Sequence, residues 1–153
     1  MEERNVCLEE IKIMTQGKLK TEMKENRPRY LETCKMLILQ SMIKLIEPSL
    51  LIMVREEDKG DIEGMISDIE QEYKDFMTEQ TDRDEYSCSL SVMDSHYLTE
   101  DLDKGCGGII MFTDNKRIMC KNTLYSRLCL TCEESLPAIR TSLFPSADDK
   151  WEK

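Results

Sequence analysis

The stretch from residue 50 to residue 92 constrains the fold more than any other part of the chain. Leu50 to Val54 is an uninterrupted apolar run of strand length, which is typical of a strand covered on both faces. Residues 59–78 carry apolar side chains at helical spacing, and Asp58 is placed to cap that helix. Residues 86–92 alternate apolar and small polar side chains, which favours a half-buried strand. Together they predict a right-handed βαβ unit with parallel strands.

Two helices are predicted before this unit. Residues 3–25 form a polar helix that Gly17 weakens, and Asn26-Arg27-Pro28 is a break because Pro disfavours helix at the residue before it. A second helix is expected over residues 29–46, ended by Glu47-Pro48. The first helix is predicted to carry a weak apolar stripe, and the second and third helices regular ones. Their members are Cys7, Ile11, Met14, Leu19, Met23, Met36, Leu39, Met42, Ile43, Ile46, Ile62, Met65, Ile66, Ile69, Tyr73, Phe76 and Met77.

After the βαβ unit the pattern changes to a hairpin and a last helix. Residues 94–106 are expected to form a polar loop, residues 109–112 and 118–120 two strands, and residues 113–116 the turn between them. Asn122 or Thr123 is predicted to cap the last helix, and Pro137 to interrupt it and kink it about one turn earlier. Its predicted buried stripe is Leu124, Leu128, Cys132, Leu136, Ile139 and Leu143.

The predicted fold class is therefore α+β. N-terminal helices precede a small mixed four-stranded sheet in the order β-α-β-β-β, and a C-terminal helix follows it. We divide the chain into an N-terminal helical segment (1–28), an α+β head domain (29–145) and a polar tail (146–153) that is expected to be frayed.

Charge and hydropathy exclude several classes of function. The chain has 31 acidic and 21 basic residues and a formal net charge of −10, which disfavours binding to nucleic acid or to anionic membranes. Its apolar runs are much shorter than the roughly 20 residues of a membrane span, and its acidic N-terminus does not resemble a signal peptide. The sequence predicts a cytoplasmic protein without direct membrane insertion, whose seven cysteines are reduced thiols.

Groups that resemble catalytic or metal sites have simpler interpretations. A Cys-His or Ser-His site would depend on His96, because it is the single histidine of the chain. We expect His96 to be an ordinary surface residue. Cys129 and Cys132 form a C-x-x-C, but Cys129 is expected about two turns into a helix instead of at its N-terminus. The glycines of Gly105-Cys106-Gly107-Gly108 precede a strand, so they indicate a tight entry or a close backbone contact. We predict no catalytic, cofactor-binding or metal-binding residues.

Several motifs near the C-terminus resemble those of the E subunit of rotary V-type ATPases. The motifs are Gly107-Gly108-Ile109-Ile110-Met111, Arg117-Ile118, Asn122-Thr123-Leu124-Tyr125-Ser126-Arg127-Leu128, and Leu136-Pro137-Ala138-Ile139-Arg140-Thr141-Ser142-Leu143-Phe144. A second block, Leu39-Gln40, Leu45, Glu47-Pro48 and Val54-Arg55, is similar to a further segment of that family. The order and separation of the blocks also match, and the resemblance covers roughly residues 30–144.

The resemblance implies a non-catalytic stator role. In that family, the E subunit pairs with the G subunit in a peripheral stalk, and its α+β head docks the stalk onto the catalytic hexamer, chiefly on the B subunit. The C and H subunits are further partners that the resemblance implies. The expected location is cytoplasmic, attached peripherally to membranes through the ATPase complex and supporting proton transport. The expected interface residues in this chain are Arg127, Arg140, Leu143 and Phe144; local salt bridges are the alternative for the two arginines.

The chain departs from the family pattern at three points. Most of the long N-terminal helix is expected to be missing, because Met1 falls close to the head. Pro145 stands where the family usually has Gly, and Glu56 stands near a position that is often basic. The missing helix leaves one alternative open, an adapter or regulator derived from the stalk head. The C-x-x-C leaves a second, a thiol oxidoreductase that uses Cys129 and Cys132.

Overall fold

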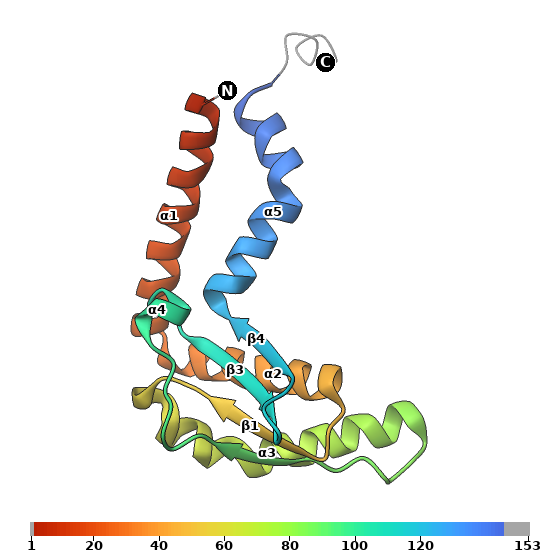
Figure 1. Cartoon of the computed structure of the whole chain (residues 1–153). Coiled ribbons are helices and arrows are strands. Elements are labelled where there is room, and N and C mark those ends of the chain that lie inside the picture. The colour runs from red at the N-terminus through yellow and green to blue at the C-terminus, as the bar shows by residue number, and fades with distance from the viewer. Residues whose placement is uncertain (1, 146–153) are drawn as a thin grey trace.

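The computed structural model describes residues 2–145, and in this part of the chain helices surround one four-stranded sheet (Figure 1). Its elements are α1 (Glu2–Glu25), α2 (Arg27–Leu45), β1 (Ser49–Met53), the short 3-10 helix η1 (Glu56–Asp58), α3 (Lys59–Thr81), β2 (Ser89–Val92), α4 (Glu100–Asp103), β3 (Gly108–Thr113), β4 (Met119–Thr123) and α5 (Leu124–Leu143). This is the predicted α+β class. The polar tail predicted over residues 146–153 lies outside the described residues.

The predicted break between the first two helices is confirmed. The Asn26 side chain accepts a hydrogen bond from the Arg29 backbone N–H (3.4 Å), and Pro28 lies in the first turn of α2, where it costs no helical hydrogen bond. At the other end of α2, Ile46 adopts a left-handed conformation and its N–H bonds to the Met42 carbonyl. This turn, followed by Pro48, directs the chain into β1.

The sheet has the strand order β2-β1-β3-β4. β1 and β2 pair in parallel, as the βαβ pattern predicts, while β3 pairs antiparallel with both β1 and β4. The second strand is shorter than predicted and begins at Ser89, opposite Ser49. Pro48 precedes Ser49 and has no N–H to donate to β2. The hydrogen-bond ladder between β1 and β2 therefore ends at the bond from the Ser89 N–H to the Pro48 carbonyl (2.9 Å).

The core lies between one face of the sheet and the helices α2 and α3. Leu50, Ile52 and Met111 are fully buried there, and Ile62 and Ile69 of α3 pack into the same cluster. The other side chains of β1 are only half-buried, so the strand is fully covered on one face and partly covered on the other. The mixed pairing explains the difference, because an antiparallel neighbour does not require a helical crossover on the second face.

Several side chains on the predicted apolar stripes are exposed. They are Met14, Met36, Ile46, Phe76 and Leu143. In α5 only Leu128 of the predicted buried stripe is fully buried, since this helix extends beyond the sheet and contacts chiefly α1 (Figure 1). Pro137 lies within the continuous helix α5, which therefore is not interrupted there.

The predicted polar loop at residues 94–106 contains the short helix α4 and leads into three glycines with positive φ angles. The buried carboxylate of Asp103 accepts hydrogen bonds from the N–H groups of Gly105 (2.8 Å) and Gly107 (3.0 Å). Gly107 packs against Tyr30 and Gly108 against Thr123, which confirms that the glycines permit close backbone contacts. No helix among residues 2–145 combines the length and apolar character that a membrane span requires.

The buried thiol of Cys34 on α2 leads to a prediction about alkaline pH. Burial raises the pKa of this thiol to about 11 from its ordinary value of 9.0. The folded state therefore retains the proton longer than the unfolded chain, and the thiol's contribution to stability is full below about pH 9 and is lost as the pH rises toward 11. We expect this group to lower the free energy of unfolding by up to about 1.4 kcal/mol per pH unit in that window.

Urea denaturation at a series of alkaline pH values tests the prediction. The slope of the free energy of unfolding against pH should be less steep in Cys34→Ala than in the wild type, whatever the absolute stability of the variant. Parallel slopes for the two proteins would contradict the assignment.

Candidate functional site

The predicted interface residues lie at the two ends of α5. At the end nearest the sheet, the exposed Arg127 donates hydrogen bonds to the Gln40 side-chain oxygen on α2 (2.9 Å) and to that of Asn122 on β4 (3.1 Å). Asn122 in turn donates to the Leu37 carbonyl (3.2 Å). Arg127 is therefore held by amides, and the salt bridges described for residues 2–145 do not include it.

Arg140, Leu143 and Phe144 lie at the opposite end of α5. Thirteen residues of helix separate Arg127 from Arg140, which corresponds to about 20 Å at 1.5 Å per residue. The Phe144 ring lies beneath the Arg4 guanidinium of α1, 5.0 Å from its centroid. The structure thus joins this end of α5 to α1 and does not bring it together with Arg127.

Helices α1 and α5 extend from the sheet side by side (Figure 1). Their contact leaves a small cavity of about 160 Å³ between them. The cavity is lined by Leu8, Glu9, Ile11, Lys12, Cys129, Cys132, Glu133, Leu136 and Ile139. The apolar members of this set are only half-buried, as expected for a contact between two helices without a third element covering it. The helix pair is therefore incompletely covered in this chain.

Apolar side chains also point away from this contact. Val6 and Ile13 are 58% and 59% exposed and lie seven residues apart, so they share one face of α1. Leu130 on α5 is 58% exposed. Single exposed apolar residues are ordinary, but two at helical spacing on one face of α1 suit packing against another helix.

A buried cluster of charged groups lies where α1, α2 and η1 meet. The carboxylate of Asp58 is 1% exposed and accepts hydrogen bonds from Arg27, from Arg55 (Nε, 2.8 Å; Nη2, 3.0 Å) and from the Tyr30 hydroxyl (2.8 Å). The Tyr30 oxygen also accepts from the Gly108 N–H (3.1 Å). The network therefore ties α2, the end of β1 and the start of β3 together.

Burial raises the pKa of the Tyr30 hydroxyl, which keeps it protonated as a donor to Asp58. For Arg55, burial opposes the charged form, but nearby Tyr30 and Asp58 outweigh it and the pKa of the guanidinium rises. The raised pKa values keep the Tyr30 hydroxyl and the Arg55 guanidinium protonated, so both remain hydrogen-bond donors to Asp58 and stabilise the structure.

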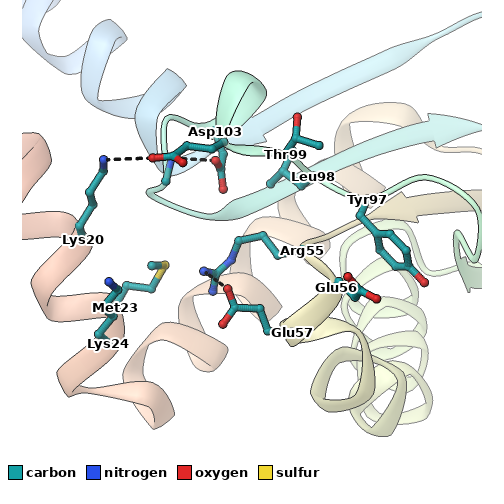
Figure 2. Close-up of a pocket in the computed structure, with 12 residues that line it drawn as sticks. Lys20, Met23, Lys24, Arg55, Glu56, Glu57, Tyr97, Leu98, Thr99 and Asp103 are labelled. Carbon is teal, nitrogen blue, oxygen red and sulfur yellow. Dashed lines mark hydrogen bonds and ion pairs between the residues drawn. The ribbon is translucent and has the colours of Figure 1, made fainter.

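An open cleft of about 590 Å³ lies beside this cluster, between α1, η1 and the segment that contains α4 (Figure 2). The Lys20 nitrogen lies 3.9 Å from the Glu100 carboxylate. Figure 2 shows Arg55 beside Glu57, and the two side chains are 3.2 Å apart. Glu56, the departure from the expected basic pattern, is an exposed side chain that lines the cleft. Positive and negative groups alternate around the cleft, so its charge favours neither an anionic nor a cationic ligand.

The remaining predicted groups form no reaction centre within residues 2–145. Cys129 and Cys132 are half-buried, and Cys129 lies in the second turn of α5 instead of at the helix N-terminus that a thioredoxin-like thiol requires. His96 is exposed as predicted and its ring contacts the Ser95 hydroxyl (2.8 Å). In the part of the chain that the structure describes, no three His, Cys, Asp or Glu side chains are grouped to hold a metal ion.

The Asp58 cluster is the part of the site that the sequence does not reveal. The sequence predicts Asp58 as the cap of α3, but its side chain makes no capping hydrogen bond and points into the cluster. Arg55 stands out in the sequence only as part of a motif. Two features of the sequence could have indicated the cluster. Asp58 and Arg55 lie close together shortly after a strand, and Arg27 lies at the start of a helix.

Comparison with known proteins gives a consistent result. A family model described as ATP synthase (E/31 kDa) subunit matches residues 1–144. The V-type proton ATPase E subunit of Dictyostelium discoideum is 29% identical over 153 residues, covering 96% of this chain and 62% of that protein. The E subunit of Manduca sexta is 33% identical (71% of this chain, 43% of that protein), and the E2 subunit of Arabidopsis thaliana is 32% identical (77% and 52%). The chain thus spans about half the length of these curated relatives.

Proposed function

The chain belongs to the ATP synthase (E/31 kDa) subunit family, and we propose that it is a non-catalytic stator component of a rotary V-type proton-translocating ATPase. In this role it docks the peripheral stalk onto the catalytic hexamer and supports proton transport without catalysing a reaction. The family match over residues 1–144 is the observation that carries the proposal. The stiff sheet and the incompletely covered pair of helices support it.

The first proposed partner is the helical G subunit. The face of α1 with Val6 and Ile13, together with Leu130 of α5, supports this pairing because apolar side chains at helical spacing suit a third helix. We propose that residues 1–28 form the head-proximal part of the stalk helix and residues 29–145 form the head. The break between α1 and α2 at Asn26 and Pro28 supports this division.

The second proposed partner is the B subunit of the hexamer, with the C and H subunits as further contacts. Arg127, Arg140, Leu143 and Phe144 are the residues proposed to make these contacts. Arg127 is exposed but held in place by Gln40 and Asn122, so it presents its charge with little conformational freedom to lose. We propose a cytoplasmic protein that reaches the membrane only through the complex and binds no nucleic acid.

The pairing with the G subunit gives a prediction. Replacing Val6 and Ile13 together by aspartate should weaken binding to this partner by about tenfold or more, because two apolar contacts at the proposed interface become charged. Isothermal titration calorimetry with the co-expressed and separated proteins measures the change.

The control for this pairing is Ile118→Asp, which introduces the same type of charge at a side chain that is 50% exposed in the β3–β4 hairpin. Unaltered binding in the control and weakened binding in the double variant would support the proposal. Equal binding in all three proteins would contradict pairing through this face. Failure of the unaltered chain to retain any V-type ATPase component in a pull-down would contradict the stator role itself.

A further inference from the structure

A groove between α2 and α3 remains without a role in the proposed stalk pairing. It has a volume of about 520 Å³. Its apolar lining comes from Met36, Leu39 and Ile43 on α2 and from Phe76 on α3. Met36 is 63% and Phe76 43% exposed, although both fall at positions where helical spacing predicts core residues. Water therefore covers large apolar side chains that this chain alone does not bury.

The rim of the groove on the α3 side is acidic. Glu72, Asp75 and Glu79 line it at intervals of three and four residues, which places them on one face of the helix. Lys35 of α2 pairs with Glu72 (2.6 Å), and Asp75 accepts a hydrogen bond from the Gln71 side chain (2.7 Å). These contacts leave a net negative edge along the groove.

The α2 side of the groove is different. Gln40 lines it there, and its side-chain oxygen accepts the hydrogen bond from Arg127. The charge of the groove is therefore asymmetric. Carboxylates lie along its α3 side, and the neutral Gln40 amide, which is hydrogen-bonded to the Arg127 guanidinium, lies on its α2 side. A ligand that fills the groove experiences a field that fixes which of its sides faces α3.

We propose that this groove binds a basic amphipathic helix of a partner protein other than the one that pairs with α1 and α5. Apolar side chains of that helix would contact Met36 and Phe76, while lysine or arginine side chains at i, i+4 spacing would face Glu72, Asp75 and Glu79. A second copy of this chain is disfavoured, because its net charge of −10 opposes contact with an acidic rim. The site uses α2 and α3 and so goes beyond the stator function proposed above.

The test uses the full chain and two synthetic helical peptides of about five turns. One carries leucine at i, i+3, i+4, i+7 spacing with lysine at the other positions, and the second has glutamate in place of every lysine. Fluorescence anisotropy measures the affinity of each labelled peptide for the wild type and for Phe76→Ala, Met36→Ala and Glu79→Lys. Thermal unfolding confirms that each variant is folded, as expected for side chains with large exposed areas.

The matched control is Glu85→Lys, which alters the net charge by the same two units as Glu79→Lys but lies in the loop after α3. We expect the lysine peptide to bind the wild type and Glu85→Lys alike, and to bind Phe76→Ala, Met36→Ala and Glu79→Lys about tenfold more weakly. The glutamate peptide should not bind measurably.

Four results would overturn the proposal. They are absence of lysine-peptide binding at about 1 mM, equal affinity for both peptides, an equal loss in Glu85→Lys, and self-association of the chain that Phe76→Ala abolishes. The last result would assign the groove to a second copy. None of these measurements involves the G subunit or the hexamer, so their outcome is independent of the stator function.

Discussion

Replacing Asp58 by alanine is expected to lower the free energy of unfolding by about 3–5 kcal/mol, because it removes a buried carboxylate that accepts hydrogen bonds from Arg27, Tyr30 and Arg55. The Arg55 side chain is only 13% exposed and donates two hydrogen bonds to this carboxylate. The Tyr30 hydroxyl also loses its acceptor, and Arg27 loses one of its acceptors and keeps Asp61. Water does not readily replace the carboxylate at a position that is 1% exposed.

Urea denaturation followed by circular dichroism measures this effect, with Asp61→Ala as the matched control. Asp61 also pairs with Arg27, but its side chain is 49% exposed, so we expect a loss below about 1 kcal/mol. A third variant, Tyr30→Phe, removes two hydrogen bonds, the one donated to Asp58 and the one accepted from the Gly108 N–H, and should cost about 1–3 kcal/mol. Equal losses for Asp58→Ala and Asp61→Ala would show that the cluster contributes no more than a surface ion pair.

Local sequence pattern is sufficient to predict most of the elements of this fold. Period-two alternation and apolar runs locate the strands, helical spacing locates α2 and α3, and the break at Asn26 to Pro28 follows from the chemistry of proline. The parallel pairing of β1 and β2 follows from the βαβ order. These features depend on neighbours within a few residues, and such information is present in a single sequence.

Features that depend on distant partners are not predictable in the same way. Asp58 has the local setting of a helix cap, but two of its actual partners lie about thirty residues away on α2. Phe76 and Met36 have the correct spacing for core positions, but both line the open groove between α2 and α3 and remain exposed. Periodicity indicates which face of a helix is apolar and does not indicate whether this chain or a partner buries it.

The interface residues are predicted from the motifs of a family rather than from physical pattern. Arg127 and the group Arg140 to Phe144 belong to neighbouring motifs, but the rise of α5 separates them by about 20 Å. A single flat contact surface of standard size can span that distance, although two separate contacts fit equally well. Binding measurements with Arg127→Ala and Arg140→Ala against the B subunit separate these two arrangements.

The glycine cluster before β3 combines local and distant constraints. Its composition indicates a close backbone contact, which the structure confirms at Gly108, where φ is +106° and the residue pairs with Thr123. A Cβ added there would lie 2.6 Å from the Thr123 Cα and 2.8 Å from the Leu124 nitrogen. Both neighbours are backbone atoms at the junction of β4 and α5, so they cannot move away as a flexible side chain would.

Gly108→Ala is therefore expected to lower the free energy of unfolding by about 3 kcal/mol or more, from the sum of the strained φ angle and the clash. Gly64→Ala in α3 is the matched control: a Cβ there meets no atom within 4 Å, and alanine is the better helix former, so we expect a gain of about 0.5–1 kcal/mol. The same chemical change thus has opposite signs at the two positions, and urea denaturation of both variants measures them. Equal effects would contradict the close contact between β3 and the start of α5, and with it the fixed direction of α5 on which the proposed pairing with the G subunit depends.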